Sequence, residues 1–286
     1  MAFDPGTIPG SLLQEYAKGR CGLLVGAGAS VGAGLPQWGD LLRQMVAEAK
    51  DNVGISDEKV SDYESLIDQG RYLMAASGLK TDLGSFFAGF IRRVFVDSKP
   101  APTELHEAIA QLAQLQFVLT TNYDTLIERT FRKNDPDVTV CTFKDAGEVR
   151  RSLSSREFFI LKAHGDATKS GDGIILTEQD YRNILFKEPA YQHMLATMFS
   201  MYTVIFAGAS MTDPEVNLML NYVASTFAPD SGPTHYALLT KEKINEVEKE
   251  RWFKDFKIRV IPVSSADEYA ELAEFVLALA ASAAPI

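Results

Sequence analysis

Short apolar runs alternate with helical patterns along this chain. A compact apolar run bounded by turn residues predicts a buried strand, whereas apolar residues spaced three and four apart predict a helix. Strands are predicted at 21–25, 117–121, 138–143, 158–162, 203–207, 235–239 and 258–263. Helices are predicted between them, including 11–21, 38–49, 104–112, 125–131, 214–226 and 269–281. The alternation predicts a Rossmann-like α/β fold, in which a parallel sheet is covered by helices on both faces.

The segment 50–105 departs from this alternation. It carries helical patterns and little strand character, and we interpret it as a helical insertion. A length of 286 residues with 46% hydrophobic content suits one large domain. We therefore predict a single domain with two parts: a Rossmann-like core at about 10–48, 106–176 and 202–286, and a small helical subdomain at about 50–105 plus 177–201.

The first predicted strand runs into a glycine-rich turn, Gly26-Ala27-Gly28-Ala29-Ser30, and then into a predicted helix. Small residues allow backbone N–H groups to approach a ligand closely, and a helix N-terminus favours an anion such as a pyrophosphate. The glycine spacing is not that of the strict dinucleotide fingerprint, and the lysine of a phosphate-binding loop is missing. A tight turn that binds no ligand therefore remains an alternative.

Four predicted strands end on small or polar residues, at Gly26, Asn122, His164 and Gly208. In an open parallel sheet, ligands bind beyond the carboxyl ends of the strands. We therefore expect these four positions to face one crevice.

Composition narrows the function. The net charge of −10 argues against direct nucleic-acid binding. The sequence has neither a run long enough to cross a membrane nor the pattern of a secretory signal. The two cysteines, Cys21 and Cys141, match no metal-binding spacing and suggest a reduced, cytoplasmic setting.

Four short motifs, taken in order, resemble those of the sirtuin fold. They are Gly26-Ala27-Gly28-Ala29-Ser30, Thr121-Asn122-Tyr123-Asp124, Lys162-Ala163-His164-Gly165-Asp166 and Gly208-Ala209-Ser210. The chain is most similar to the sirtuin-like NAD⁺ hydrolases of bacterial anti-phage systems. It lacks the four-cysteine zinc ribbon of sirtuin deacylases, so we expect no metal. Gly34-Leu35-Pro36-Gln37-Trp38 also stands where deacylases have Gly-Ile-Pro-Asp-Phe-Arg. These departures favour cleavage of NAD⁺ itself.

The resemblance implies catalytic roles for Asn122 and His164. Asn122 would bind a ribose hydroxyl or orient a water molecule, and His164 would act as general base. Each has a structural alternative: Asn122 would cap the helix that starts at Thr125, and His164 would be a turn residue. Asp124 would either orient the ribose or Asn122, or cap the same helix.

The resemblance also implies that NAD⁺ binds as the substrate. The residues expected to hold it are Gly26, Ala27, Gly28, Ala29, Ser30, Pro36, Trp38, Thr121, Asp124, Gly208 and Ser210.

The function favoured here is an NAD⁺ glycohydrolase that depletes NAD⁺ during abortive infection. Such an enzyme must be held inactive until triggered. We therefore expect a separate regulatory partner, such as an ATPase or a nucleic-acid-guided protein, and assembly into a homo-oligomer. Two alternatives remain: an NAD⁺-dependent protein deacylase, and a sensor that binds NAD⁺ or ADP-ribose without turnover. A hydride-transfer dehydrogenase is weakly supported, because the acidic residue of the strict fingerprint is missing.

Overall fold

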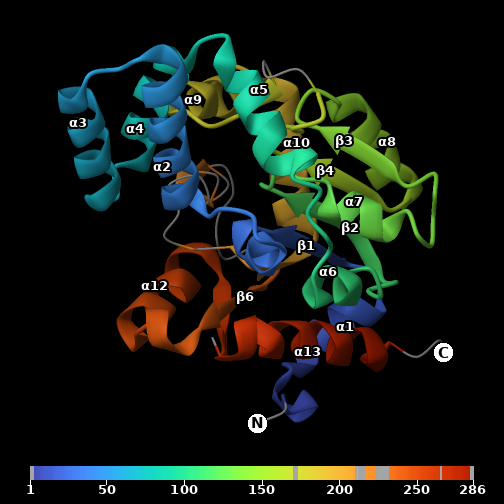
Figure 1. The fold of residues 1–286 in the computed structure, drawn as a ribbon. Helices are drawn as coiled ribbons and strands as arrows, with labels where there is room; N and C mark the ends of the chain where they lie inside the picture. Colours follow the sequence, from blue (N-terminus) through green and yellow to red (C-terminus); the bar gives the residue numbers. More distant parts are fainter. Residues whose placement is uncertain are drawn as a thin grey trace.

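Seven parallel strands form the centre of the computed structural model, which describes residues 3–169, 173–209, 211, 217–218, 220–222, 224, 232–264 and 266–283 (Figure 1). The strands are β1 (Cys21–Val25), β2 (Leu115–Thr120), β3 (Thr139–Thr142), β4 (Phe159–Lys162), β5 (Thr203–Ala207), β6 (His235–Thr240) and β7 (Ile258–Val263). Each predicted strand is confirmed, because apolar runs of this length have a favourable place only inside a covered sheet.

The strand order is β3-β4-β2-β1-β5-β6-β7. The chain starts at the middle of the sheet with β1, builds one half through β2, and later returns to the other side of β1 with β5. All six pairings are parallel, so the carboxyl ends of the strands share one edge. The order reverses beside β1, which is where open α/β sheets form their binding crevice.

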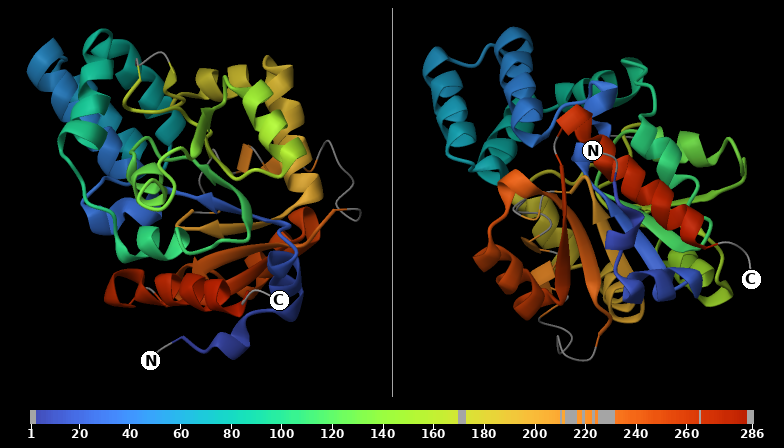
Figure 2. Two further views of the ribbon diagram at one scale, coloured as in Figure 1. Left: turned by 90° about the vertical axis from the view of Figure 1, so that its right-hand side faces the viewer. Right: turned by 90° about the horizontal axis from the view of Figure 1, so that it is seen from below.

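Helices cover both faces of the sheet, as Figure 2 shows from two sides. One face packs against α1 (Gly10–Ala17), α6 (Glu104–Ile109), α7 (Leu126–Phe131) and α13 (Ala266–Ser282). The other packs against α8 (Ala146–Ser155), α9 (Glu178–Phe186), α10 (Pro189–Met201) and α12 (Glu246–Phe256). Strands β1, β2, β4 and β5 are buried along their whole length, as two covered faces require.

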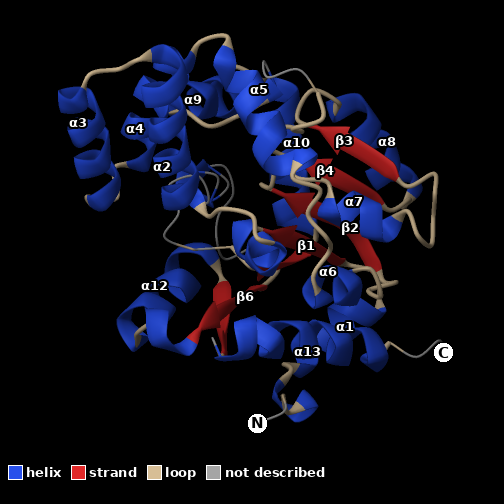
Figure 3. Cartoon of the chain, in the orientation of Figure 1, coloured by secondary structure: helices blue, strands red, loops and turns tan. Residues whose placement is uncertain are grey.

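The predicted helical insertion is helical. It contains α3 (Asp57–Asp68), α4 (Tyr72–Leu83) and α5 (Phe86–Arg92), with short π-helical turns at Ala49–Val53 and Arg93–Asp97. Helix α2 (Trp38–Glu48), which the prediction assigned to the core, packs against α3 and α4. These helices form a hydrophobic cluster beside the sheet, and no strand lies among the helices (Figure 3). The cluster also includes Tyr123, Leu126, Ala167, Ile174 and Leu176. The proposed division of the chain into a core and a subdomain stays a prediction.

Two helix predictions need correction or qualification, and one helix was not predicted. The segment 177–201 is two helices, because Pro189 cannot donate a backbone hydrogen bond and begins α10 instead. Helix α8 was not predicted, and among its residues Val149 and Ser152 are buried. The predicted helix 214–226 lies largely outside the described residues. Among the helices the structure describes, none is long and apolar enough to cross a membrane.

Candidate active site

The glycine-rich turn packs tightly against the end of β5. The backbone N–H of Gly28 donates to the carbonyl of Gly208 at 2.8 Å, and that of Gly26 donates to Ala207 at 3.1 Å. A Cβ on Gly28 would lie 2.6 Å from the Gly208 carbonyl oxygen, and Gly208 itself has a φ of +63°. At both Gly26 and Gly28 the close approach that the structure shows is to the neighbouring loop after β5, and the approach to a ligand stays a prediction.

The helix predicted directly after this turn is wrong in kind. Ala27–Ala33 forms a 3₁₀ helix that ends at Gly34 in the left-handed conformation, and α2 begins only at Trp38. The turn thus folds back on itself before the insertion starts, because small residues permit the tighter coil.

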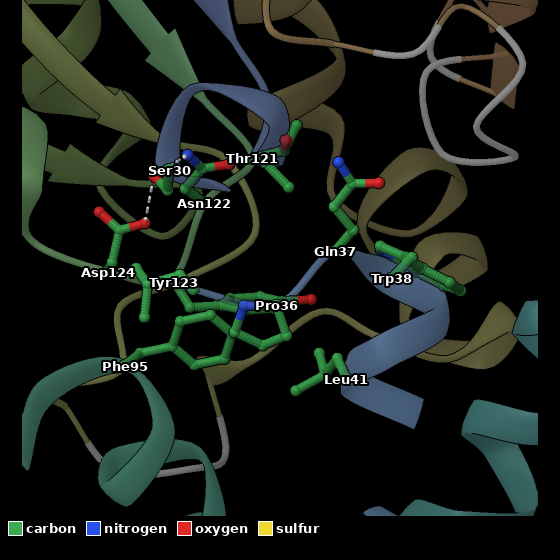
Figure 4. Close-up of a pocket in the computed structure, with 12 residues that line it drawn as sticks. Ser30, Pro36, Gln37, Trp38, Leu41, Phe95, Thr121, Asn122, Tyr123 and Asp124 are labelled. Atoms are coloured by element: carbon green, nitrogen blue, oxygen red, sulfur yellow. Dashed lines mark hydrogen bonds between the residues drawn. The ribbon is translucent and has the colours of Figure 1, made fainter. Parts of the chain in front are cut away.

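The carboxamide of Asn122 is held in one orientation. Its Nδ2 donates to the carbonyl of Gly26 and to Oγ of Ser30, both at 3.2 Å. Ser30 in turn donates to Oδ2 of Asp124 at 2.9 Å (Figure 4). Because the two amide hydrogens of Asn122 both have acceptors, the orientation of the group is defined. Its Oδ1 is buried and has no hydrogen-bond partner among the described residues.

Asp124, and not Asn122, caps the helix that follows β2. Oδ1 of Asp124 accepts from the backbone N–H of Leu126 at 2.9 Å, at the start of α7. The same carboxylate holds Ser30 through its other oxygen. The structural alternative for Asn122 is therefore wrong. Asp124 both caps the helix and orients Asn122 through Ser30, and its contact with a ribose stays a prediction.

Two adjoining cavities open at this edge of the sheet. The smaller, of 30 Å³, has room for a water molecule and is lined by the predicted residues Ala27, Ser30, Pro36, Trp38, Thr121, Asn122 and Asp124. Gln37, Phe95 and Tyr123 complete much of its wall and were not predicted.

The larger cavity has a volume of 340 Å³, within the range of ligand pockets. Its lining includes the predicted residues Ala27, Gly28, Trp38 and Gly208. Gly26 and Ala29 line neither cavity, and Ser210 lies outside the described residues. Residues that the sequence did not indicate, including Tyr72, Thr240, Glu248 and Trp252, form the rest of the lining.

Trp38 stands in the wall that the two cavities share. Its ring lies 5.7 Å from that of Tyr72, which the insertion contributes from α4. Gln37 also lines both cavities. The insertion therefore supplies one side of the site, in addition to its own core.

His164 does not line either cavity. It follows β4, whose end is tied to that of β2 by the hydrogen bond from Ala163 N to Thr120 O at 2.9 Å. Its imidazole points to α9. Nδ1 of His164 lies 3.4 Å from the hydroxyl of Tyr181 in that helix, and the two rings pack edge to face. Burial lowers the pKa of His164 to about 3, so the imidazole is neutral at physiological pH.

A buried lysine holds the backbone of the segment that follows Asn122. Lys162 is fully buried, and its Nζ donates to the carbonyls of Tyr123 and Asp124 and to Oε1 of Glu128, the last at 2.6 Å. Oδ1 of Asp166 lies 3.5 Å away. Burial raises the pKa of Glu128 and the charge of Lys162 opposes that effect. A lysine at the end of an otherwise apolar strand was the available signal for this cluster.

Comparison with known proteins decides the family. The sequence profile of the SIR2-like domain family matches residues 116–261, just over half of the chain. The chain belongs to the SIR2-like domain family.

This SIR2-like chain has curated relatives in bacteria. It is 27% identical to "Defense-associated sirtuin 2" of Bacillus subtilis over 257 residues, which are 89% of this chain and 24% of that protein. It is 28% identical over 251 residues to "NAD(+) hydrolase ThsA" of Bacillus cereus, covering 86% of this chain and 48% of that protein. The chain thus spans between about a quarter and about half of the length of these relatives.

A solved structure supports the same fold. A Sir2 homologue in complex with 2'-O-acetyl ADP ribose superposes with a TM-score of 0.50 at 15% identity, covering 96% of each chain. The Rossmann-like sirtuin fold inferred from the four motifs is therefore confirmed.

The SIR2-like chain keeps its two cysteines apart, Cys21 in β1 and Cys141 in β3, and both are buried and free. In the part of the chain that the structure describes, no cluster of three or more histidine, cysteine or acidic side chains is arranged to hold a metal ion.

Proposed function

We propose that this SIR2-like domain is an NAD⁺ glycohydrolase, which breaks the bond between nicotinamide and ribose to give nicotinamide and ADP-ribose. The observation that carries the proposal is the Asn122 carboxamide, whose oxygen is left as an unpartnered acceptor at the smaller cavity. Curated relatives that cover most of this chain are named as NAD⁺ hydrolases, which supports the same reaction.

In this proposal NAD⁺ lies across both cavities. The adenosine half occupies the larger cavity, and the pyrophosphate crosses the turn at Ala27 and Gly28 opposite Gly208. The nicotinamide ribose lies beside Asn122 in the smaller cavity. Because that cavity has room only for a water molecule, the wall formed by Gln37 and Trp38 moves to admit the nicotinamide ring.

The chemistry follows from one heterolytic cleavage. The electron pair of the C1'–N1 bond leaves with nicotinamide, and positive charge develops on the ribose as in glycoside hydrolysis. Oδ1 of Asn122 accepts a hydrogen bond from a ribose hydroxyl or from the attacking water, which fixes its position. The water oxygen bonds to C1' and its proton passes to a base. Buried dipoles stabilise the charge that develops in this transition state.

His164 is the proposed base. It lies at the strand end next to that of Asn122 and is neutral at physiological pH. Reaching the ribose requires its ring to turn away from Tyr181, and the substrate supplies the hydrogen-bond partner for the new position. As a base with a low pKa, it would keep kcat/KM free of an inflection near pH 6.5.

The test is NAD⁺ consumption with product analysis, for wild type, Asn122→Ala and His164→Ala. Matched controls are Asn134→Ala and His193→Ala, which alter exposed residues of the same types. We expect nicotinamide and ADP-ribose from the wild type and both controls, and a loss of at least about 100-fold in both site variants. Full activity of Asn122→Ala would overturn the proposal. ADP-ribose binding without turnover would identify a sensor instead.

We also propose a setting for this activity. The enzyme would deplete cytoplasmic NAD⁺ during abortive infection, as a homo-oligomer held inactive until a separate protein triggers it. The names of the defence-associated relatives support this setting. Measuring NAD⁺ loss against protein concentration, with and without proteins encoded beside this one, tests it. A monomer that is fully active on its own would contradict both the homo-oligomer and the separate triggering protein.

A further inference from the structure

The two proposed catalytic residues lie beyond the end of a strand ladder. The parallel pairing of β2 with β4 ends at Thr120 and Lys162, and Asn122 and His164 each follow two residues later. Backbone groups that leave a ladder need other hydrogen-bond partners to hold them in place. The distance between Asn122 and His164 therefore depends on contacts outside the sheet.

The side chain of Tyr123 supplies one such contact. Its hydroxyl donates to the carbonyl of Ile175 at 2.7 Å, and the N–H of Ile175 donates to the carbonyl of His164 at 3.0 Å. One buried residue thus binds Tyr123 with its carbonyl and His164 with its N–H. Since Tyr123 directly follows Asn122 in the chain, these two hydrogen bonds join the segments that carry both proposed catalytic residues.

Tyr123 is itself held firmly. Its carbonyl accepts from the N–H of Ala167 at 3.0 Å and from Nζ of Lys162 at 3.3 Å. Its side chain is buried, and the ring packs edge to face on Phe95 with the centroids 5.3 Å apart (Figure 4). Packing therefore fixes the direction of the hydroxyl, as a group that positions others requires.

We propose that Tyr123 is a positioning residue, which holds the segment of His164 beside that of Asn122 through Ile175. The inference rests on the proposed function for the roles of Asn122 and His164 in NAD⁺ cleavage. Tyr123→Phe keeps the ring in the wall of the smaller cavity but removes the hydrogen bond to the Ile175 carbonyl. The variant should therefore bind NAD⁺ as wild type does and place the base less accurately, and a displacement of about 1 Å can cost about 100-fold in rate.

The test is steady-state cleavage of NAD⁺ by wild type, Tyr123→Phe and the matched control Tyr236→Phe. Tyr236 of β6 is likewise buried, and its hydroxyl shares a hydrogen bond with Oγ of Ser11 in α1 at 2.7 Å. Both variants lose one hydrogen bond, so their melting temperatures should fall by similar amounts. We expect Tyr123→Phe to lower kcat at least about tenfold with KM within about twofold of wild type, and Tyr236→Phe to change neither. An unchanged kcat in Tyr123→Phe, or an equal fall in the two variants, would overturn the inference.

Combining Tyr123→Phe with His164→Ala tests whether Tyr123 acts through the histidine. The added substitution should change the residual rate of His164→Ala by less than about twofold, because the group that Tyr123 positions is already gone. A further fall of about tenfold would show that Tyr123 acts independently of His164 and would overturn the inference.

Hydrogen exchange at the Ile175 amide separates the inference from the proposed function, because it needs no turnover. The exchange rate should rise at least about tenfold in Tyr123→Phe and stay at the wild-type value in Tyr236→Phe. Unchanged exchange in Tyr123→Phe would overturn the inference even if wild type cleaves NAD⁺. Faster exchange in a protein whose wild type does not cleave NAD⁺ would support the link through Ile175 and reject the hydrolase.

Discussion

Replacing Asn122 with aspartate changes one atom of the side chain and reverses its hydrogen-bonding role. In the native protein Nδ2 donates to the Gly26 carbonyl and to Ser30 Oγ. A carboxylate in that place would present oxygen to both acceptors. It would also face Asp124, which already holds the hydroxyl hydrogen of Ser30. The group would be buried with no cation beside it among its described contacts.

The magnitude follows from these contacts. Asn122→Ala removes two hydrogen bonds, each contributing about 1 kcal/mol, so it should lower the free energy of unfolding by about 2 kcal/mol. Asn122→Asp loses the same bonds and adds the desolvation of an unpaired charge, for a total of about 4 kcal/mol. In a protein of this size the gap of about 2 kcal/mol separates the two melting temperatures by about 4 to 8 °C.

The pH dependence of that gap tests the cause. Burial and the Asp124 charge raise the pKa of the new carboxyl group above its unfolded value near 3.9, so its folded state binds a proton more readily. The variant therefore gains stability relative to Asn122→Ala as the pH falls, and a protonated carboxyl regains an O–H donor. Thermal unfolding of both variants at pH 8 and pH 5.5 measures this. Equal stability at pH 8, or a gap that widens in acid, would refute the reasoning.

Three other changes test the fold by denaturant unfolding. Lys162→Met leaves Glu128 buried and unpaired and should lower the free energy of unfolding by about 3 to 5 kcal/mol. The double variant with Glu128→Leu should regain much of that free energy, and a double variant as unstable as Lys162→Met would argue against the ion pair. Gly28→Ala should destabilise by about 1 to 3 kcal/mol because its Cβ meets the neighbouring carbonyl, while Gly147→Ala, with open space around it, should not. Burial lowers the pKa of His235 to about 4, so between pH 6.5 and 4 the unfolded chain binds a proton there that the folded protein does not, and acid reduces the free energy of unfolding. His235→Asn should make this loss shallower by up to about 1.4 kcal/mol per pH unit in that range, and an unchanged slope would contradict the reasoning.

The sheet was predictable because each strand is a local pattern. The five residues of β1 and of β5 are buried on both faces, so their sequences are apolar almost throughout. The parallel arrangement then follows from the helices between them. The residues of the cavity walls were harder to predict from the sequence, because Phe95, Tyr72 and Glu248 reach the site from elements whose relative placement depends on tertiary packing.

Among the site residues, too, the position of a residue was predictable from the sequence whereas its hydrogen-bond partners were not. Sequence reasoning located Asn122 but left open whether it capped a helix, because its partner Ser30 is 92 residues away in the chain. The structure resolves that alternative through the hydrogen bonds of Asp124, which already satisfies the first N–H of α7. A polar residue at a strand end has a defined role only when the residues that compete for the same donors are known.

For His164 the sequence predicted the position of the residue but not the direction of its side chain. Its position at the end of β4, next to β2, was predictable from strand order, whereas the direction of its ring depends on Tyr181 in α9. That helix was predicted as part of one continuous segment, so its face could not be assigned. The carboxamide of Asn122 is held by Gly26 and by Ser30, which Asp124 positions, while His164 packs against Tyr181 and its burial lowers its pKa. In the proposed mechanism the substrate reorients His164 and finds Asn122 already in place, which predicts that mutations at Tyr181 alter kcat more than KM.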